Sequence, residues 1–323
     1  MTKVAESKFL WTGIAATKGK RIFVNFPRWD GKSPYAVAEI LSDGSAKPYP
    51  DLSWNSWKDE DPDVGSKFVC VQSVFCDDRD DLWILDSGNP YLKGVLRNAP
   101  KLVKVETRKN AVEKIYRFPG DVLAPASYLN DVRIDAAGSR AYISDSGVGA
   151  IHVLDLETGR VRKILADHPS TRAEDIVFRV EGVEIRQKIH CDGIALDPRG
   201  EYLYYKALTG KVLYRLSTRI LRDFRIASDR IKDGVERVAE VGVCDGMGFG
   251  PDGTLWITSL ENQAIKKWDA QNGLRIVVQN PEIQWPDSLA VCADGSVYFT
   301  VSKLHLDPVQ AVPYKIFVIQ SRR

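Results

Sequence analysis

A short pattern of polar and apolar positions recurs six times along the chain. Each copy opens with a pair of polar or small residues, continues as a short apolar strand and a turn, and returns as a strand that carries an aromatic residue. The six opening pairs are Thr12-Gly13, Gln72-Ser73, Asn130-Asp131, Asp192-Gly193, Asp245-Gly246 and Asp287-Ser288. Two short apolar runs on either side of a turn predict a β-hairpin in every copy.

The spacing within the copies is nearly constant. Counted from the second residue of the pair, the aromatic lies ten positions on in four copies and eleven positions on in the copies that contain Tyr142 and Tyr204. A hairpin turn that is one residue longer accounts for this difference. Asp252-Gly253 and Asp294-Gly295 are strong hairpin signals between apolar runs.

Further strands follow each hairpin. Third strands are expected at 36–41, 101–106, 150–156, 211–216, 264–269 and 315–320, and fourth strands at 46–50, 112–118, 161–166, 235–241 and 275–279. Four strands in each of six repeats predict an all-β fold: a six-bladed β-propeller with four-stranded antiparallel blades. The pattern assigns residues 1–323 to a single domain.

The last copy lacks a fourth strand, because the chain ends at Arg323. The N-terminal KVAESKFL is otherwise unassigned, and we expect it to supply this strand and close the ring, which removes an exposed sheet edge. Two segments lie outside the repeat: residues 167–190 form a long connection, and the mixed apolar spacing of residues 217–234 predicts a short helix.

Composition narrows the functional classes. Lys and Arg total 45 against 43 for Asp and Glu, and this balance gives no electrostatic reason to bind nucleic acid or an anionic membrane. None of the five cysteines forms a CxxC pair, which disfavours a structural zinc site. The N-terminus shows no apolar signal region, so we expect a cytoplasmic protein with a small-molecule substrate or ligand.

Strand direction predicts where a site would lie. The first strand of each blade lines the axis of a propeller, so the six pairs should meet at one end of the channel. The turns after the second strands reach the same face. The carboxylates Asp192, Asp245 and Asp287 and the amide Asn130 would repel one another unless a cation lay among them, and their oxygens suit Ca²⁺ or Mg²⁺.

Other side chains are candidates for binding or catalysis at this end of the channel. Gln72 belongs to the ring of pairs, Arg28, Asp86 and Asp145 lie in the turns, Lys206 could stabilise an anion, and His190 could act as a general base. The alternative remains open that the Asp-Gly and Asn-Asp pairs only support turns at strand entry, where aspartate accepts from backbone amides.

Several motifs resemble the yellow/major royal jelly protein family: RIFVNFPRW at 21–29, DDLWILDSG at 80–88 and YISDSGVGAIHVLDLETG at 142–159. The last two copies look more like the related gluconolactonase and senescence-marker propellers. The resemblance implies a six-bladed propeller, and the lack of a visible signal peptide suits a bacterial, intracellular relative. Known family members include dopachrome-converting enzymes and amine-binding proteins.

In gluconolactonase-like propellers a Glu of the first repeat, an Asn of the fourth and an Asp of the fifth hold a divalent metal, and an Asn of the third contacts substrate. Asn130 and Asp245 match this pattern. Asp192 replaces the Asn, Thr12 stands where Glu is expected, and Asp287 could compensate for the missing ligand.

Three functions follow as hypotheses. The first is a metal-dependent lactone or ester hydrolase with Asp192, Asp245, Asp287 and Asn130 around the ion. The second is a dopachrome-type tautomerase or isomerase, in which a channel carboxylate or His190 moves a proton. The third is a non-catalytic amine-binding protein.

Overall fold

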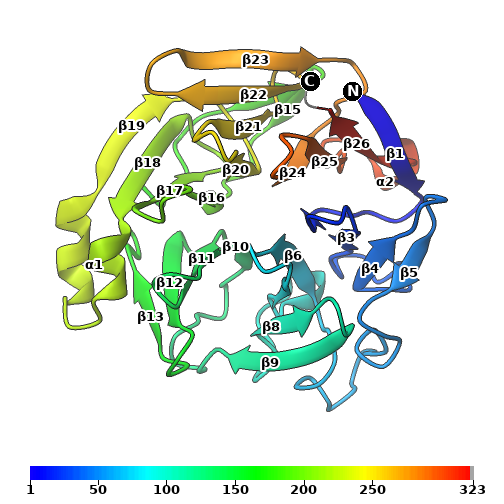
Figure 1. Ribbon diagram of the computed structural model, residues 1–323, viewed down its shortest axis with the longest axis horizontal. Helices are drawn as coiled ribbons and strands as arrows, with labels where there is room; N and C mark the ends of the chain where they lie inside the picture. The colour runs from blue at the N-terminus through cyan, green and yellow to red at the C-terminus, as the bar shows by residue number, and fades with distance from the viewer. Residues whose placement is uncertain (321–323) are drawn as a thin grey trace.

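The computed structural model describes residues 1–320, and its strands form six four-stranded antiparallel sheets and one two-stranded sheet. The six larger sheets lie as blades around a common axis, with the inner strand of each directed toward the centre (Figure 1). The predicted six-bladed β-propeller is therefore confirmed.

Each blade follows the chain outward from the axis. Blade one contains β2 (Ile14–Ala16), β3 (Ile22–Asn25), β4 (Val37–Ile40) and β5 (Ala46–Pro48). Blade two contains β6 (Val71–Cys76), β7 (Leu82–Asp86), β8 (Lys101–Glu106) and β9 (Ala111–Arg117). Blade three contains β10 (Leu129–Asp135), β11 (Arg140–Asp145), β12 (Ala150–Asp155) and β13 (Val161–Ile164).

The remaining blades follow the same order. Blade four contains β16 (Cys191–Leu196), β17 (Tyr202–Ala207), β18 (Val212–Ser217) and β19 (Glu236–Glu240). Blade five contains β20 (Met247–Phe249), β21 (Leu255–Ser259), β22 (Ala264–Asp269) and β23 (Gly273–Gln279). Blade six contains β24 (Pro286–Val291), β25 (Val297–Val301), β26 (Tyr314–Ile319) and the N-terminal β1 (Thr2–Ser7).

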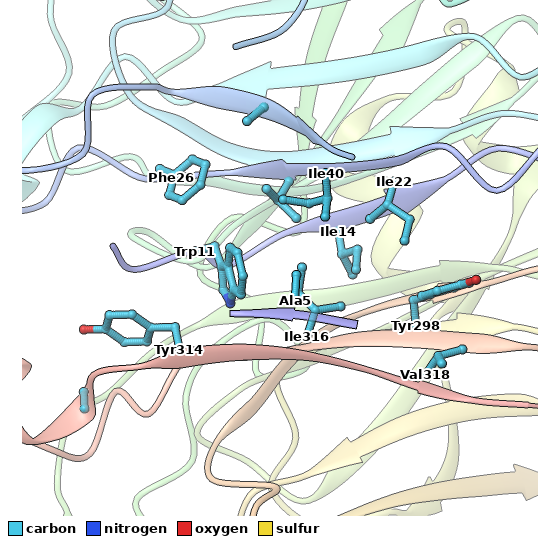
Figure 2. Packing of buried hydrophobic residues seen from close by; sticks show 13 residues of the cluster. Ala5, Trp11, Ile14, Ile22, Phe26, Ile40, Tyr298, Tyr314, Ile316 and Val318 are labelled. Atoms are coloured by element: carbon cyan, nitrogen blue, oxygen red, sulfur yellow. The ribbon is translucent and has the colours of Figure 1, made fainter. Parts of the chain in front are cut away.

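The N-terminal strand closes the ring, as predicted. β1 pairs antiparallel with β26, and the two strands lie side by side in Figure 1. The side chain of Ala5 points from β1 into a cluster that contains Trp11, Ile14 and Ile316 (Figure 2). Strand pairing and apolar burial therefore act together to join the first and last segments of the chain.

The hydrophobic core is divided among the spaces between blades. Six buried clusters each combine residues of two neighbouring blades, so every blade is apolar on both faces. In β3, for example, Phe23 packs toward blade two and Val24 toward blade six. Successive strand residues point to opposite faces, which explains why the inner strands read as continuous apolar runs rather than as alternating ones.

Two segments lie outside the ring. Residues 217–234 contain α1 (Thr218–Arg222) and the 3-10 helix η2 (Ser228–Gly234), in agreement with the short helix expected there. The long connection 167–190 contains a small hairpin of β14 (Phe178–Val180) and β15 (Val183–Ile185), which the sequence pattern did not predict. The other helices are η1 (Pro90–Leu92) and α2 (Pro308–Ala311). Within residues 1–320, helices are all too short or too polar to cross a bilayer.

Candidate functional site

The polar pairs lie at the inner ends of the blades, at irregular positions in the strands. The pairing of first and second strands shifts register at the pair in four blades, through β6, β10, β16 and β24. A β-bulge of this kind turns two successive residues toward the same side and re-aims their side chains. The bulges therefore allow both members of a pair to approach the axis.

The first residues of the pairs form a buried, hydrogen-bonded layer. Asn130 Nδ2 donates to Asp192 Oδ2 across 2.8 Å, and Gln72 Nε2 lies 3.5 Å from Asn130 Oδ1. Tyr128 Oη donates to Gln72 Oε1 at 2.8 Å. These contacts link blades two, three and four, so the structure brings Gln72, Asn130 and Asp192 together as the repeat predicted.

The three axial carboxyls share one electrostatic environment. Burial, followed by the negative charges of Asp287 and Asp131, raises the pKa of Asp192 well above its usual range. Burial and the charges of Asp287 and Asp192 do the same to the pKa of Asp245. Burial raises the pKa of Asp287 to about 7, although hydrogen bonds from the hydroxyl groups of Ser302 and Ser288 act to lower it. Proximity and desolvation thus both favour the neutral acid.

The second residue of two of the pairs is a glycine because the neighbouring blade leaves no room for a side chain. A Cβ at Gly193 would collide with the carbonyl oxygen of Asp245, and one at Gly246 would collide with that of Asp287. Gly246 N–H also donates to Asp287 O at 2.7 Å. Glycine follows aspartate at these positions because the backbone of the next blade passes close by. This steric requirement differs from the turn propensity that could also explain an Asp-Gly pair.

A cavity of about 470 Å³ occupies the channel beyond this layer, toward the turns between first and second strands. Its inner end is lined by second residues of the pairs, Ser73, Asp131, Gly246 and Ser288, and its walls combine apolar residues with charged ones such as Asp135. Asp192, Asp245 and Asp287 do not line it. We had expected the site to open at the face where the pairs lie, whereas this cavity opens toward the opposite face.

Asp131 and Arg133 are the charged residues at the inner end of the cavity. Arg133 Nη1 donates to Asp131 Oδ1 at 2.7 Å, and Nη2 donates to Met247 O of blade five at 2.7 Å. Ser73 Oγ also donates to Asp131 Oδ1, at 2.9 Å. The repeat pattern did not predict this pair, because Asp131 lies in the bulge of β10 and the direction of its side chain depends on that bulge.

The other predicted site residues have structural partners. Asp86 is fully buried and accepts from Val69 N–H, Cys70 N–H and Lys101 Nζ at 2.7 to 2.9 Å. Arg28 donates to the carbonyls of Val69 and Trp57. These contacts hold the connection between blades one and two.

Asp145 has a comparable structural role in blade three. It is fully buried, and it accepts from Tyr128 N–H at 2.9 Å while its Oδ2 lies 3.1 Å from His152 Nε2. Burial opposes the charge, but these hydrogen bonds, led by that to His152, hold the pKa of Asp145 below its usual range. Asp145 therefore acts in the structure as an ionised cap for the loop that ends at Tyr128.

Lys206 lies between blades four and five rather than in the cavity. In blades three and six the equivalent positions carry Ser144 and Thr300, whose hydroxyls donate to the backbone carbonyl of the next blade's pair. Lys206 is fully buried, and its Nζ donates to Ala207 O at 2.6 Å. The Lys206 ammonium group therefore lies among backbone carbonyls and does not line the cavity.

His190 lies beside the channel layer with one ring nitrogen in use. Its Nδ1 accepts from Ala173 N–H at 2.9 Å. Burial, followed by the charge of Arg172, lowers the pKa of His190, so the ring is neutral and carries its proton on Nε2. Such a ring offers a donor, whereas a general base needs an unprotonated nitrogen facing the substrate.

The predicted divalent metal has no assembled ligand set in the part of the chain that is described. Among residues 1–320, no three His, Cys, Asp or Glu side chains are grouped so that they could hold one ion. Thr12, which replaces the expected glutamate, directs its hydroxyl to Gln72 O. The ion at Asp192, Asp245, Asp287 and Asn130 therefore stays a prediction.

Comparison with known proteins gives a consistent family signal. The sequence profile described as major royal jelly protein matches residues 69–310. Major royal jelly protein 5 of Apis mellifera is 24% identical over 282 residues, covering 80% of this chain and 45% of that protein. Protein yellow of Drosophila melanogaster is 26% identical over 234 residues, covering 67% and 43%. The chain thus spans about half the length of these curated relatives.

Solved structures show the same fold at low identity. A gluconolactonase from Xanthomonas campestris is similar with a TM-score of 0.60 and 11% identity, over 98% of this chain and 89% of that one. A luciferin-regenerating enzyme gives a TM-score of 0.59 at 11% identity, over 99% and 93%. At these identities the likeness concerns the fold.

Proposed function

The chain belongs to the major royal jelly protein family, and within that family we propose that it moves protons on a small organic molecule held in the axial cavity, as a tautomerase or isomerase does. One observation carries the proposal: three carboxyls are buried together on the axis, and the pKa of one of them is raised to about 7. A proton donor or acceptor works best when its pKa lies near the working pH.

Asp131 is the carboxyl that a bound molecule would meet. It lines the cavity, and its hydrogen bonds to Ser73, Val132 and Arg133 all use Oδ1. Oδ2 is therefore the oxygen left for a substrate proton. Arg133 Nη1 pairs with Oδ1 at 2.7 Å and so orients the carboxyl without occupying Oδ2.

Asp192 and Asp287 lie in the buried layer next to Asp131, where their raised pKa values favour the protonated form. The charge of Asp131 contributes to the raised pKa of both, so a proton taken up by Asp131 changes their affinity. In the proposed reaction Asp131 accepts a proton from one atom of the substrate through Oδ2 and returns it to another atom of the same molecule, while Asp192 and Asp287 act on Asp131 from the layer outside the cavity. Substrate and product are isomers, so no co-reactant is required.

The cavity supports a substrate of modest size. Its volume of about 470 Å³ falls within the range of small-molecule sites, and its lining offers both apolar and polar groups to a ligand. The turn residues at its opening include Asp78, Asp197 and Arg199. We therefore expect a small polar organic molecule with one enolisable or ionisable end directed at Asp131 and Ser288.

A second candidate function is the binding of a small organic cation without turnover. No salt bridge within residues 1–320 joins Asp192, Asp245 or Asp287 to a basic side chain, and the buried Lys206 acts on Asp192 only through its charge at longer range. A protonated amine at the inner end of the cavity would bring a positive charge close to this acidic layer. This candidate and the proton-transfer reaction share a site and differ in whether the ligand is changed.

The deciding experiment is a turnover and binding screen of the purified protein. Dopachrome tests tautomerisation, a δ-lactone tests hydrolysis and small aliphatic amines test cation binding, each with wild type, Asp131→Asn and the surface control Asp252→Asn. We expect isomerisation that survives a chelator and is lost in Asp131→Asn. Amine binding without turnover supports the second candidate, and lactone hydrolysis abolished by the chelator contradicts the proposal in favour of a metal.

A further inference from the structure

The β14–β15 hairpin covers the face of the propeller at which the polar pairs lie. Phe178 and Val180 of β14 are buried in one apolar cluster with residues from the connections of blades four, five and six. Those residues are Leu208, Val243, Leu260 and Trp285. The hairpin therefore packs over the end of the channel layer that is opposite to the cavity opening.

Glu181 fastens the tip of this hairpin to blades five and six. Its Oε1 accepts from Gln263 Nε2 at 2.7 Å, and its Oε2 accepts from Gln284 Nε2 and His305 Nε2, both at 2.8 Å. Glu181 adopts a φ of 51°, a left-handed conformation that is uncommon outside glycine. Three donors on one carboxylate make this tip a specific attachment rather than a loose loop.

Trp285 connects the attachment to the axial carboxyls. Its ring stacks on that of His305, with centroids 6.1 Å apart and planes 9° apart, and its Nε1 donates to Asp245 Oδ2 at 2.8 Å. The ring centroid of Phe178, which belongs to the hairpin, lies 6.2 Å from that of Trp285. A continuous series of contacts thus runs from Glu181 through His305 and Trp285 to Asp245.

The backbone of Trp285 is held in an unusual conformation. Its φ of 56° is left-handed, which is an outlier for a bulky side chain. Such conformations persist where the surroundings determine them, and they gather at ligand clamps and switch segments. Ser302 N–H donates to Trp285 O at 3.1 Å, and the ring is 3% exposed, so both backbone and side chain are fixed.

We propose that Trp285 is a positioning residue for Asp245, and that the β14–β15 hairpin is a lid that holds Trp285 in place through Glu181 and His305. This inference rests on the proposed function, because Asp245 belongs to the cluster of axial acids. The groups that face Asp245 are Asp192 and Asp287 from the neighbouring blades, Cys244 beside it in the chain, and the Trp285 indole. The indole is the one among them that favours the charged carboxylate.

Infrared spectroscopy of protonated carboxyls across a pH series tests the link between Trp285 and Asp245. Trp285→Phe keeps a ring at the position and removes the donor, and Trp268→Phe, on β22 beside Tyr204, is the matched control. We expect about a tenfold increase in proton affinity for one carboxyl in Trp285→Phe and none in the control. An unchanged midpoint in Trp285→Phe would overturn the inference.

Hydrogen exchange of the full chain tests the lid and covers the case that Trp285→Phe does not fold. Glu181→Gln removes the charge of the attachment, and Glu184→Gln, an exposed residue of the same hairpin, is the control. We expect amides of residues 176–190 to exchange on the order of tenfold faster in Glu181→Gln, with a shift of the same carboxyl midpoint. Equal exchange in both variants would contradict the lid.

Failure of this inference and failure of the proposed function give different results. If wild type shows no protonated carboxyl near neutral pH, the proposed function fails, whatever the variants do. If wild type shows protonated carboxyls and neither Trp285→Phe nor Glu181→Gln moves them, only the positioning role is lost.

Discussion

Asn130 Nδ2 and Asp192 Oδ2 lie 2.8 Å apart across the boundary between blades three and four. The same amide nitrogen donates to Ser146 Oγ at 2.9 Å, and the amide oxygen faces Gln72 Nε2. Because the amide oxygen accepts from Gln72 Nε2, the amide nitrogen is the side that faces Asp192. Asn130 is therefore an oriented donor toward one of the axial acids.

Loss of this donor should cost more stability at high pH than at low pH. The hydrogen bond from Asn130 favours the charged form of Asp192, so Asn130→Ala should raise the pKa of that carboxyl further. We expect a loss of about 1–3 kcal/mol in the free energy of unfolding, larger at pH 8 than at pH 5. Urea unfolding at both pH values measures it, with the exposed Asn262→Ala as control. A penalty independent of pH would contradict the assignment.

Asp287→Asn should flatten the dependence of stability on pH. An aspartate titrates near 3.8 when unfolded, and burial raises the pKa of Asp287 to about 7. The folded protein thus binds this proton more tightly than the unfolded chain does. The stability that the bound proton contributes is complete below about pH 4 and is lost as the pH rises to about 7. The asparagine variant has no such proton to lose. Its free energy of unfolding relative to wild type should therefore rise by up to about 1.4 kcal/mol for each pH unit between about pH 4 and 7.

Urea unfolding between pH 4 and 7 checks this sign. Asp294→Asn is the control, because hydrogen bonds led by that from Ser296 lower the pKa of the Asp294 carboxyl. A lowered pKa changes stability only below the unfolded value, so this variant should run parallel to wild type above pH 4. Parallel curves for Asp287→Asn as well would show that Asp287 does not hold a proton in the folded state.

Lys101→Met should be among the most destabilising single changes of charge. Lys101 Nζ and Asp86 Oδ2 lie 2.8 Å apart, and both side chains are fully buried. Removal of the ammonium leaves an unpaired buried carboxylate, which costs about 3–5 kcal/mol. Thermal or urea unfolding measures the loss. Lys109→Met, whose side chain is 71% exposed, should cost less than about 1 kcal/mol, and equal losses would refute the role of burial.

Closure of the ring by the N-terminal strand predicts sensitivity at Ala5. This residue is 5% exposed within the cluster that joins blades one and six. Ala5→Asp places an unpaired charge there and should lower the free energy of unfolding by about 2–4 kcal/mol. It should also promote aggregation at the freed edge of β26, measured by light scattering during heating. The neighbouring exposed Glu6→Gln should behave as wild type.

Repetition made the fold predictable from the sequence. Six copies of one strand pattern gave the blade number, and the unassigned strand before Thr12 gave the closure by β1. The β14–β15 hairpin was not predicted, because Phe178, Val180 and Val183 form runs too short to distinguish from a loop. Its position depends on contacts with Leu208 and Trp285, which are distant in the chain.

The candidate site was predictable only in part. The repeat located Gln72, Asn130 and Asp192 together, since equivalent positions in a ring meet at its axis. It gave no sign that bulges turn the second residues inward, and so Asp131 was not considered. Lys206 and Asp86 could not be assigned from spacing, because their roles depend on backbone groups of neighbouring segments.

The most direct test of the central claim is a carbon-13 NMR titration of the aspartate carboxyls in wild type, Asp287→Asn and Asp192→Asn. The account predicts that at least one carboxyl in wild type titrates near pH 7, that this signal is absent in Asp287→Asn, and that the remaining midpoints fall when a charged neighbour is removed. Titration of every aspartate below pH 5 in wild type would contradict it.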